Sequence, residues 1–308
     1  MLDVILESAL LIACGVLWRL VRPLGLDAET VRRSLTGVVY VLLLPALVLT
    51  VLWRAPLSLD AVRVALSALF GLVVAGLLAW AWFRGGRHPN YVVGALLLAA
   101  VFPNATYLGL PVLEASLGPW ARSIAIQYDL FACTPLLLSG GVMLAARYGG
   151  VREVGHPLLA LLKVPPLWAA VVAVALNLMQ VPVPHVLGGV LDMLSPGVVP
   201  LMLFSLGLGL RWDADALGRM PALIPVLLIQ LVLTPLAVWG FAGLLGLQGG
   251  MLTGVVLEAA MPAMVLGIVL CDRFGLDTAL YAMAVTLSTA LSMLTLPLWF
   301  SLLGGGAV

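Results

Sequence analysis

Two carboxyl groups lie deep inside long apolar stretches of this chain. Glu258 stands about ten residues into the run 248–275, and Asp129 stands about nine residues into the run 120–147. A carboxylate in such surroundings is costly, and inside a membrane it usually marks an ion or proton pathway. Each group is therefore a candidate coupling-ion site that carries a proton or helps to hold Na⁺. A neutral acid, hydrogen-bonded for structural reasons, is the alternative for each.

A second pattern occurs twice and concerns proline. Pro103 is followed six residues later by Gly109, and Pro262 is followed five residues later by Gly267. Proline has no backbone N–H and disfavours helix in the residue before it, so we predict a helix break at both points. About 12 residues precede each break, which places both near the middle of a bilayer. Ordinary proline kinks are the alternative.

A helix break offers its own chemistry. Backbone amides at the start of the second half-helix have no partner within the helix and carry partial positive charge. They can bind a carboxylate without a buried arginine, and Asn104 adds a hydrogen-bonding side chain or a helix cap. Tyr107 and Met264 supply an apolar wall, or simply pack. The predicted substrate-binding residues are Pro103, Asn104, Ala105, Thr106, Tyr107, Pro262, Ala263 and Met264.

The composition says which elements must position these residues. Of 308 residues, 63% are hydrophobic and 9% are charged, and the mean hydropathy is +1.17. These values exclude a soluble globular protein and a disordered one. A net charge of +1 suggests no nucleic acid or other polyanion as partner. The lipid bilayer is the expected surrounding.

Metal, cofactor and enzyme chemistry find little support in the sequence. The three cysteines, Cys14, Cys133 and Cys271, are far apart and show no metal-ligand spacing. His88, His156 and His185 lie in predicted loops, so an intramembrane metal hydrolase or a Ser/His pair has no obvious members. We therefore expect no metal, no cofactor and no enzymatic activity, apart from coupling to H⁺ or Na⁺.

The chain divides into ten apolar runs that predict ten transmembrane helices and an all-α membrane fold. They lie at 2–22, 34–53, 61–83, 90–118, 120–147, 158–180, 186–210, 219–246, 248–275 and 277–303.

Basic residues predict the orientation of these runs. With the N-terminus outside, 12 of the 15 lysines and arginines fall on the cytoplasmic side, as the positive-inside rule requires. These are Arg19, Arg22, Arg32, Arg33, Arg84, Arg87, Arg147, Arg152, Lys163, Arg211, Arg219 and Arg273. We expect a multi-pass protein of the cytoplasmic (inner) membrane with both termini outside.

The two interrupted runs also point to an internal repeat. The two prolines are 159 residues apart, and Pro45 and Pro200 correspond in the second and seventh runs. Five runs form one unit, and because five is odd the second unit is inserted upside down. Paired interrupted helices in inverted repeats are typical of secondary transporters and mark the substrate site.

The same stretches resemble the auxin efflux carrier family, which includes bacterial dicarboxylate permeases. The matching stretches are FPNATYLGLPVL at 102–113 with Gly118, LMLFSLGL at 201–208, EAAMP at 258–262 with DRFG at 272–275, and STALS at 288–292 with Pro297. They occur in order over nearly the whole chain. The connection after the fifth run is short, as in prokaryotic-type members, and lacks the long cytoplasmic loop of the plant proteins.

The resemblance implies two inverted five-helix repeats, at 1–147 and 158–303, with the broken fourth and ninth helices crossing at the bilayer midplane. It implies a scaffold of helices 1, 2, 6 and 7, a transport bundle of helices 3, 4, 5, 8, 9 and 10, elevator-like motion and, in many members, a homodimer. Pro103, Asn104 and Pro262 carry over to the site. Family substrates are small organic acids such as malonate, malate or indole-3-acetate. Glu258 is also similar to the ninth-helix glutamate of the related bile acid:sodium symporters.

The sequence thus predicts a secondary transporter of a small organic anion. A sodium-coupled carrier of larger amphipathic anions is the alternative within the same class. A membrane sensor that binds a ligand without moving it is the alternative of another class, and a membrane-embedded enzyme comes third.

Overall fold

The computed structural model describes residues 2–54, 59–85, 88–150, 162–210 and 214–304. Arg87, Arg152, Arg211, His156 and the predicted repeat boundary at 158 lie outside these ranges. Within them the chain is helical and contains no strand, only one isolated β-bridge. The all-helical class predicted from the apolar runs is therefore confirmed for the described residues.

The first half of the chain forms the following elements. They are α1 (Leu2–Val21), η1 (Pro23–Gly25), α2 (Ala28–Val38), η2 (Val39–Leu43), α3 (Leu44–Arg54), α4 (Leu59–Phe83), α5 (Asn90–Val101), η3 (Ala105–Gly109), α6 (Leu110–Leu117), η4 (Pro119–Ala121), α7 (Arg122–Tyr128), η5 (Asp129–Cys133), α8 (Thr134–Leu136), η6 (Leu137–Gly141) and α9 (Val142–Gly149).

The second half of the chain forms the remaining elements. Its elements are α11 (Pro165–Leu178), α12 (His185–Leu194), η7 (Ser195–Gly197), α13 (Val198–Gly209), η8 (Ala214–Leu223), α14 (Ile224–Leu228), η9 (Ile229–Leu233), α15 (Thr234–Leu244), α16 (Gly249–Ala259), α17 (Gly267–Phe274) and α18 (Thr278–Leu302).

Among the described residues, six continuous helices are long and apolar enough to cross a membrane: Ala28–Arg54, Leu59–Phe83, Pro119–Gly149, His185–Gly209, Arg219–Leu244 and Thr278–Leu302. Shorter apolar helices occur at Ala9–Val21, Asn90–Val101, Pro165–Leu178 and Gly249–Ala259. These lengths and compositions are those of a multi-pass membrane protein. The count of ten spans and the inverted repeat stay predictions.

Several prolines lie within helical segments without breaking them. Pro45, Pro111, Pro135 and Pro235 each follow a five-residue π-helical turn, in which the residue before the proline donates to the carbonyl five positions back. A proline ring clashes with the carbonyl of the preceding turn, and a wider turn makes room for it. At these positions the chain therefore stays helical, which separates them from Pro103 and Pro262.

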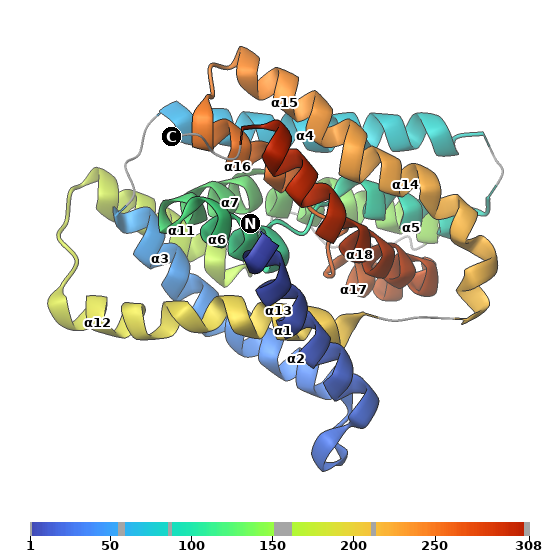
Figure 1. Ribbon diagram of the computed structural model, residues 1–308, viewed down its shortest axis with the longest axis horizontal. Coiled ribbons are helices and arrows are strands. Elements are labelled where there is room, and N and C mark those ends of the chain that lie inside the picture. Colours follow the sequence, from blue (N-terminus) through green and yellow to red (C-terminus); the bar gives the residue numbers. More distant parts are fainter. Residues whose placement is uncertain (1, 55–58, 86–87, 151–161, 211–213, 305–308) are drawn as a thin grey trace.

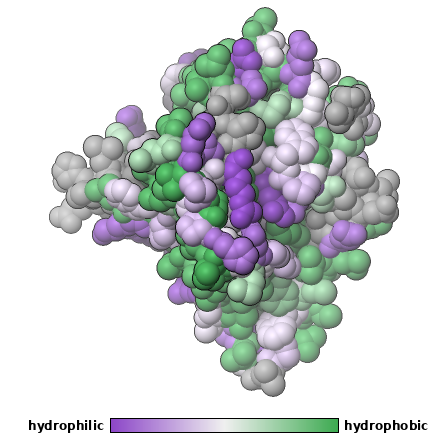
Figure 2. Space-filling view, turned by 90° about the vertical axis from the view of Figure 1, so that its left-hand side faces the viewer, coloured by the Kyte–Doolittle hydropathy of each residue, from purple (hydrophilic) through white to green (hydrophobic). Residues whose placement is uncertain are grey.

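The helices pack in two groups. In the first group, α1 lies against α13, α11 against α3, and α2 against α13. In the second, α4 lies against α5 and α15, which runs beside it along the top of Figure 1, and α5 also packs against α9 and α18. Figure 2 looks at the end of the molecule where α3 ends and α12 begins, and hydrophilic side chains gather near the centre of that face.

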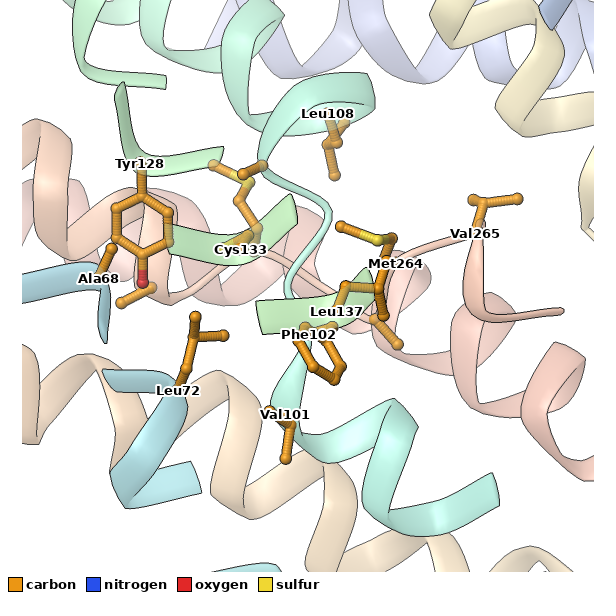
Figure 3. Packing of buried hydrophobic residues seen from close by; sticks show 14 of the residues in the cluster. Ala68, Leu72, Val101, Phe102, Leu108, Tyr128, Cys133, Leu137, Met264 and Val265 are labelled. Atoms are coloured by element: carbon orange, nitrogen blue, oxygen red, sulfur yellow. The ribbon is translucent and has the colours of Figure 1, made fainter. Parts of the chain in front are cut away.

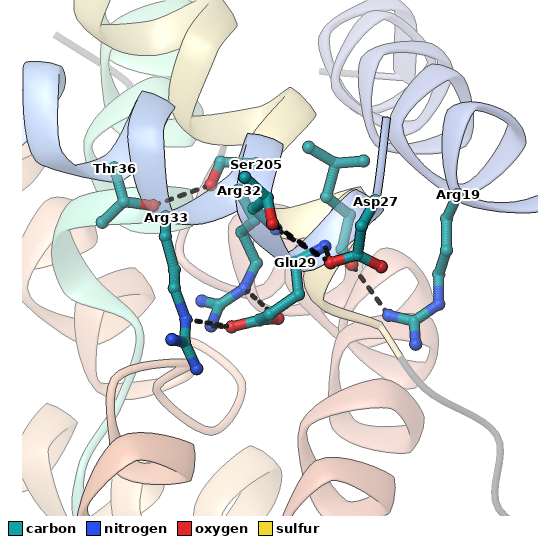
Figure 4. Close-up of polar contacts among 9 residues, drawn as sticks. Arg19, Asp27, Glu29, Arg32, Arg33, Thr36 and Ser205 are labelled. Atoms are coloured by element: carbon teal, nitrogen blue, oxygen red, sulfur yellow. Dashed lines mark hydrogen bonds and ion pairs between the residues drawn. The ribbon is translucent and has the colours of Figure 1, made fainter. Parts of the chain in front are cut away.

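Polar contacts hold the first group together at the N-terminal end of α2 and along that helix (Figure 4). The Asp27 carboxylate caps α2 by accepting from two backbone amides at 3.1 Å. Arg19 of α1 donates to the Leu208 carbonyl of α13 at 2.9 Å, and the Thr36 hydroxyl of α2 lies 3.0 Å from that of Ser205 in α13. Both α1 and α2 are thereby fixed to α13.

Two glycines allow α1 and α13 to touch backbone to backbone. A Cβ at Gly15 would lie 2.2 Å from the Phe204 carbonyl oxygen, and one at Gly207 would lie 2.0 Å from the Ile12 carbonyl oxygen. No side chain can move aside to relieve these contacts, because both partners are backbone. Such close approach is how small residues join membrane helices.

We predict that Gly207→Ala lowers the stability of the purified protein by about 1–3 kcal/mol, since α1 and α13 must separate. Thermal unfolding in detergent should show a lower Tm. The matched control is Gly189→Ala on α12, where an added Cβ meets no atom within 4 Å. Equal Tm values for the two variants would contradict the close-packing argument.

Candidate functional site

Both predicted helix breaks are present. Helix α5 ends at Val101, Phe102 is extended with φ −100° and ψ 107°, and helical structure resumes at Ala105. Helix α16 ends at Ala259, and α17 begins only at Gly267. The prolines at 103 and 262 therefore divide two apolar segments into half-helices. Their depth in a bilayer stays a prediction.

The two breaks are hydrogen-bonded to each other. The amide of Asn104 donates to the Pro262 carbonyl at 2.7 Å, and the amide of Met264 donates to the Phe102 carbonyl at 2.9 Å. Pro103 and Ala263 thus form an antiparallel β-bridge, the isolated one in the described chain. Figure 3 shows Met264 beside Phe102 at this crossing. Two extended pieces 159 residues apart satisfy one another where no water reaches them.

This pairing limits which backbone amides could meet a carboxylate. The amides of Asn104 and Met264 are not free for a carboxylate, because each already has a carbonyl partner. The amide of Ala263 is also engaged, since it donates to the Ser288 hydroxyl at 3.0 Å. The sequence could not reveal these partners, which come from segments far away in the chain. Polar groups without a partner at the crossing are therefore to be sought among its side chains.

Three side chains from neighbouring helices hold the crossing in place. Ser288 of α18 accepts from the Ala263 amide, the Tyr281 hydroxyl of α18 donates to the Met264 carbonyl at 2.7 Å, and Gln230 Nε2 lies 3.4 Å from the Phe102 carbonyl. Ser288 is not among the site residues predicted from the sequence, yet its hydroxyl binds the backbone of the second break.

The glycine after each proline now has a physical explanation. A Cβ at Gly109 would lie 2.4 Å from Oε2 and 2.6 Å from Oε1 of Glu258. A Cβ at Gly267 would lie 2.0 Å from the Tyr281 hydroxyl oxygen. Each glycine therefore leaves room for the polar end of a buried side chain. The spacing was visible in the sequence, but its reason was not.

Several buried polar atoms near the crossing have no hydrogen-bond partner. Asn104 is 1% exposed and Glu258 0%, and neither the amide group of the first nor the carboxyl oxygens of the second are satisfied. The Gln230 Oε1 and the hydroxyls of Thr234 and Thr289 share this condition. Each unsatisfied buried group costs about 1–3 kcal/mol. A concentration of them calls for a functional explanation such as a ligand or ion.

Asp129 is placed differently from Glu258. Its carboxylate accepts from the Thr106 hydroxyl in η3 and from the Thr134 hydroxyl at 3.0 Å. Asp129 and Thr106 therefore connect the fifth segment to the first break. This is the hydrogen-bonded arrangement that the sequence left open for a buried acid. Of the two carboxyl groups, Glu258 has the unmet coordinating capacity.

The apolar members of the predicted site also lie at the crossing. Ala105 and Ala263 are fully buried, Met264 is 6% exposed, and Tyr107 is partly exposed on the half-helix that follows the first break. Within the described residues no three His, Cys, Asp or Glu side chains come together in a way that could hold a metal ion.

Comparisons with known proteins place this architecture in a family. A family model described as membrane transport protein matches residues 8–300. The chain belongs to this membrane transport protein family. This is the auxin efflux carrier-like family that the sequence stretches resembled, so that prediction is confirmed. The chain is thus a multi-pass membrane protein of a transporter family.

Two archaeal relatives extend the match over almost the full length. One is an uncharacterized transporter of Methanothermobacter thermautotrophicus, 31% identical over 300 residues that cover 96% of each chain. The other is an uncharacterized transporter of Methanocaldococcus jannaschii, 24% identical over 308 residues that cover 97% of each chain.

We predict that Ser288→Ala weakens the crossing in this membrane transport protein, because the Ala263 amide loses its partner in a water-free site. The expected loss is about 1–3 kcal/mol, seen as a lower Tm in detergent. Ser301→Ala is the control: that exposed hydroxyl on the same helix donates to the Leu298 carbonyl at 2.8 Å. If both serines tolerate alanine equally, Ser288 does not hold the break.

Proposed function

We propose that this chain is a secondary active transporter that moves a small organic anion across the cytoplasmic membrane. The observation that carries the proposal is the crossing of two hydrogen-bonded helix breaks surrounded by unsatisfied buried polar side chains. Interrupted helices that meet inside a bundle are where secondary transporters bind substrate and ion. Membership of a transporter family supports the same conclusion.

The proposed architecture has ten spans in two inverted repeats, with both termini outside. The scaffold comprises α1, α2–α3, α11 and α12–α13, and the remaining helices form the bundle that moves past it. The two packing groups support this division, because the four scaffold segments pack chiefly among themselves. An elevator-type motion follows naturally when one group carries the site and the other does not.

The substrate carboxylate docks at the crossing in this proposal. The Asn104 side chain supplies an unsatisfied amide donor, and the amides that begin the half-helix at Ala105 and Thr106 lie next to it in the chain. Pro103, Pro262 and Ala263 shape the backbone around the ligand, while Tyr107 and Met264 contact its apolar body. No lysine or arginine belongs to this set, so recognition is by dipoles.

We propose Glu258 as the principal coupling-ion residue and Asp129 as a second candidate. Both carboxyl oxygens of Glu258 are buried, unsatisfied and close against Gly109, which belongs to the first break. A proton or Na⁺ bound there would satisfy the carboxyl group and change the charge beside the substrate. Binding of ion and anion would then favour each other, which is what cotransport requires.

The first transport prediction concerns Asn104→Ala. Uptake is measured in proteoliposomes with radiolabelled malonate, malate and indole-3-acetate. For the acid that the unmodified protein transports, uptake by this variant should be at least about tenfold lower. Asn90→Ala is the control, because Asn90 is exposed at the start of the same segment. Normal uptake by Asn104→Ala would remove this side chain from the site. Binding of an acid without flux would instead favour a sensor.

The second transport prediction concerns Glu258→Gln. Uptake driven by an imposed pH or Na⁺ gradient should lose its dependence on the driving ion, because the amide neither releases a proton nor carries the charge that attracts Na⁺. Exchange of substrate at equal concentrations should persist. Glu7→Gln is the control, since Glu7 is exposed on α1. Gradient-driven accumulation that survives in Glu258→Gln would assign coupling elsewhere, with Asp129→Asn the next variant to measure.

A further inference from the structure

A cavity of about 420 Å³ lies away from the crossing, between the two packing groups. We call it the seam pocket. It is lined by Leu47, Pro111, Glu114, Ala115, Pro119, Arg122, Ser195, Pro196, Val199 and Pro200. One wall comes from α3, η7 and α13, and the other comes from α6, η4 and α7. Its volume falls in the range of small-molecule sites.

The walls of the seam pocket offer few hydrogen bonds. Four of its residues are prolines, which have no backbone N–H to donate. The Ser195 hydroxyl already donates to the Leu191 carbonyl at 2.7 Å and lies 3.2 Å from the Thr50 hydroxyl. The pocket is therefore mostly apolar, and its unmet polar capacity must come from the remaining wall.

That wall carries an ion pair between Arg122 and Glu114. The guanidinium Nη2 donates to the Glu114 carboxylate, and the two side chains are only 24% and 23% exposed. The Nε of Arg122 is buried and has no partner. A guanidinium has five N–H donors in a planar fork, suited to bidentate binding of a carboxylate. Glu114 leaves part of that fork unused.

The seam pocket is also related to the crossing by helix geometry. Tyr107, Pro111 and Ala115 follow one another at intervals of four residues along η3 and α6. Residues four apart share a face of a helix, so the face that lines the seam pocket continues to the predicted site residue Tyr107. An anion held in the pocket would therefore lie on the same side of this half-helix as the crossing.

We propose that the seam pocket is a second binding site for a small organic anion with an apolar body. Arg122 holds the carboxylate, and the proline-rich walls hold the body. Glu114 competes with the ligand for Arg122 and is displaced when the anion binds. This inference rests on the proposed function for the class of ligand, but its test measures binding and needs no transport.

The test uses Ala115→Cys as a reporter, because Ala115 is exposed and lines the pocket. Cys14, the exposed native cysteine, is replaced by serine, while Cys133 and Cys271 are buried. The rate of labelling by a neutral thiol reagent is measured in detergent with increasing benzoate. Benzamide, its uncharged counterpart, is the ligand control. Benzoate should slow labelling and benzamide should not.

Substitutions of Arg122 and of Glu114 should change the affinity for benzoate in opposite directions. Arg122→Gln should raise the half-protecting benzoate concentration by at least about tenfold, and Glu114→Gln should lower it by about fivefold. A purely structural salt bridge would give changes of the same sign. Arg122→Lys, which keeps the charge, is measured as well in case the glutamine variant does not fold, and it should lie between the unmodified protein and Arg122→Gln. Arg63→Gln, which removes the Arg63–Asp60 pair on α4, should leave protection unchanged.

Failure of this inference is distinguishable from failure of the proposed function. If benzoate gives no protection at concentrations up to about 100 times a millimolar Kd, the proposal that the seam pocket binds an anion is wrong. Equal protection of Arg122→Gln, Arg122→Lys and the unmodified protein would show that Arg122 does not hold the anion. Protection that persists in Asn104→Ala supports a separate site, whereas its loss there would assign the bound anion to the crossing.

Discussion

The antiparallel pair of hydrogen bonds between the two helix breaks is the constraint on which the rest of the structure depends. A break in an apolar segment strands backbone donors and acceptors where water cannot serve them. The bonds from Asn104 to Pro262 and from Met264 to Phe102 solve this for both breaks at once. They also fix two distant parts of the chain at one point. Ser288, Tyr281 and Gln230 then serve this junction, and the glycines at 109 and 267 make room around it.

At the crossing the backbone groups have hydrogen-bond partners, whereas several buried side chains do not. Because carbonyls and amides of the breaks bind one another, the junction does not need a ligand in order to persist. The unmet groups include the amide group of Asn104, which belongs to the first break, and the carboxyl group of Glu258, which reaches that break from α16. In the proposed carrier, a substrate and an ion can therefore bind and leave without breaking the backbone hydrogen bonds of the crossing, which a carrier must allow in every cycle.

The sequence predicted the breaks, because proline acts on its own neighbours, and it predicted the buried carboxyl groups, because burial follows from the apolar runs. It did not predict the partners of the freed amides. Those partners are set by which carbonyl of the other break faces each amide, and that is a property of packing between segments 159 residues apart. Ser288 was not predicted for the same reason: from the sequence alone, a hydroxyl that only packs in an apolar helix cannot be distinguished from one that binds a broken backbone.

Within the described residues, no arginine lies at the crossing, whereas Arg122 lines the seam pocket, and the same physical argument explains both facts. A buried guanidinium at the crossing would hold an anion by a strong charge-assisted bond and would slow its release. A site of amide dipoles without a guanidinium binds an anion more weakly and releases it faster. Arg122 can attract an anion without trapping it, because Glu114 stands beside it as an alternative partner. Exchange of one carboxylate for another leaves the guanidinium paired throughout, so neither binding nor release leaves Arg122 without a counter-charge.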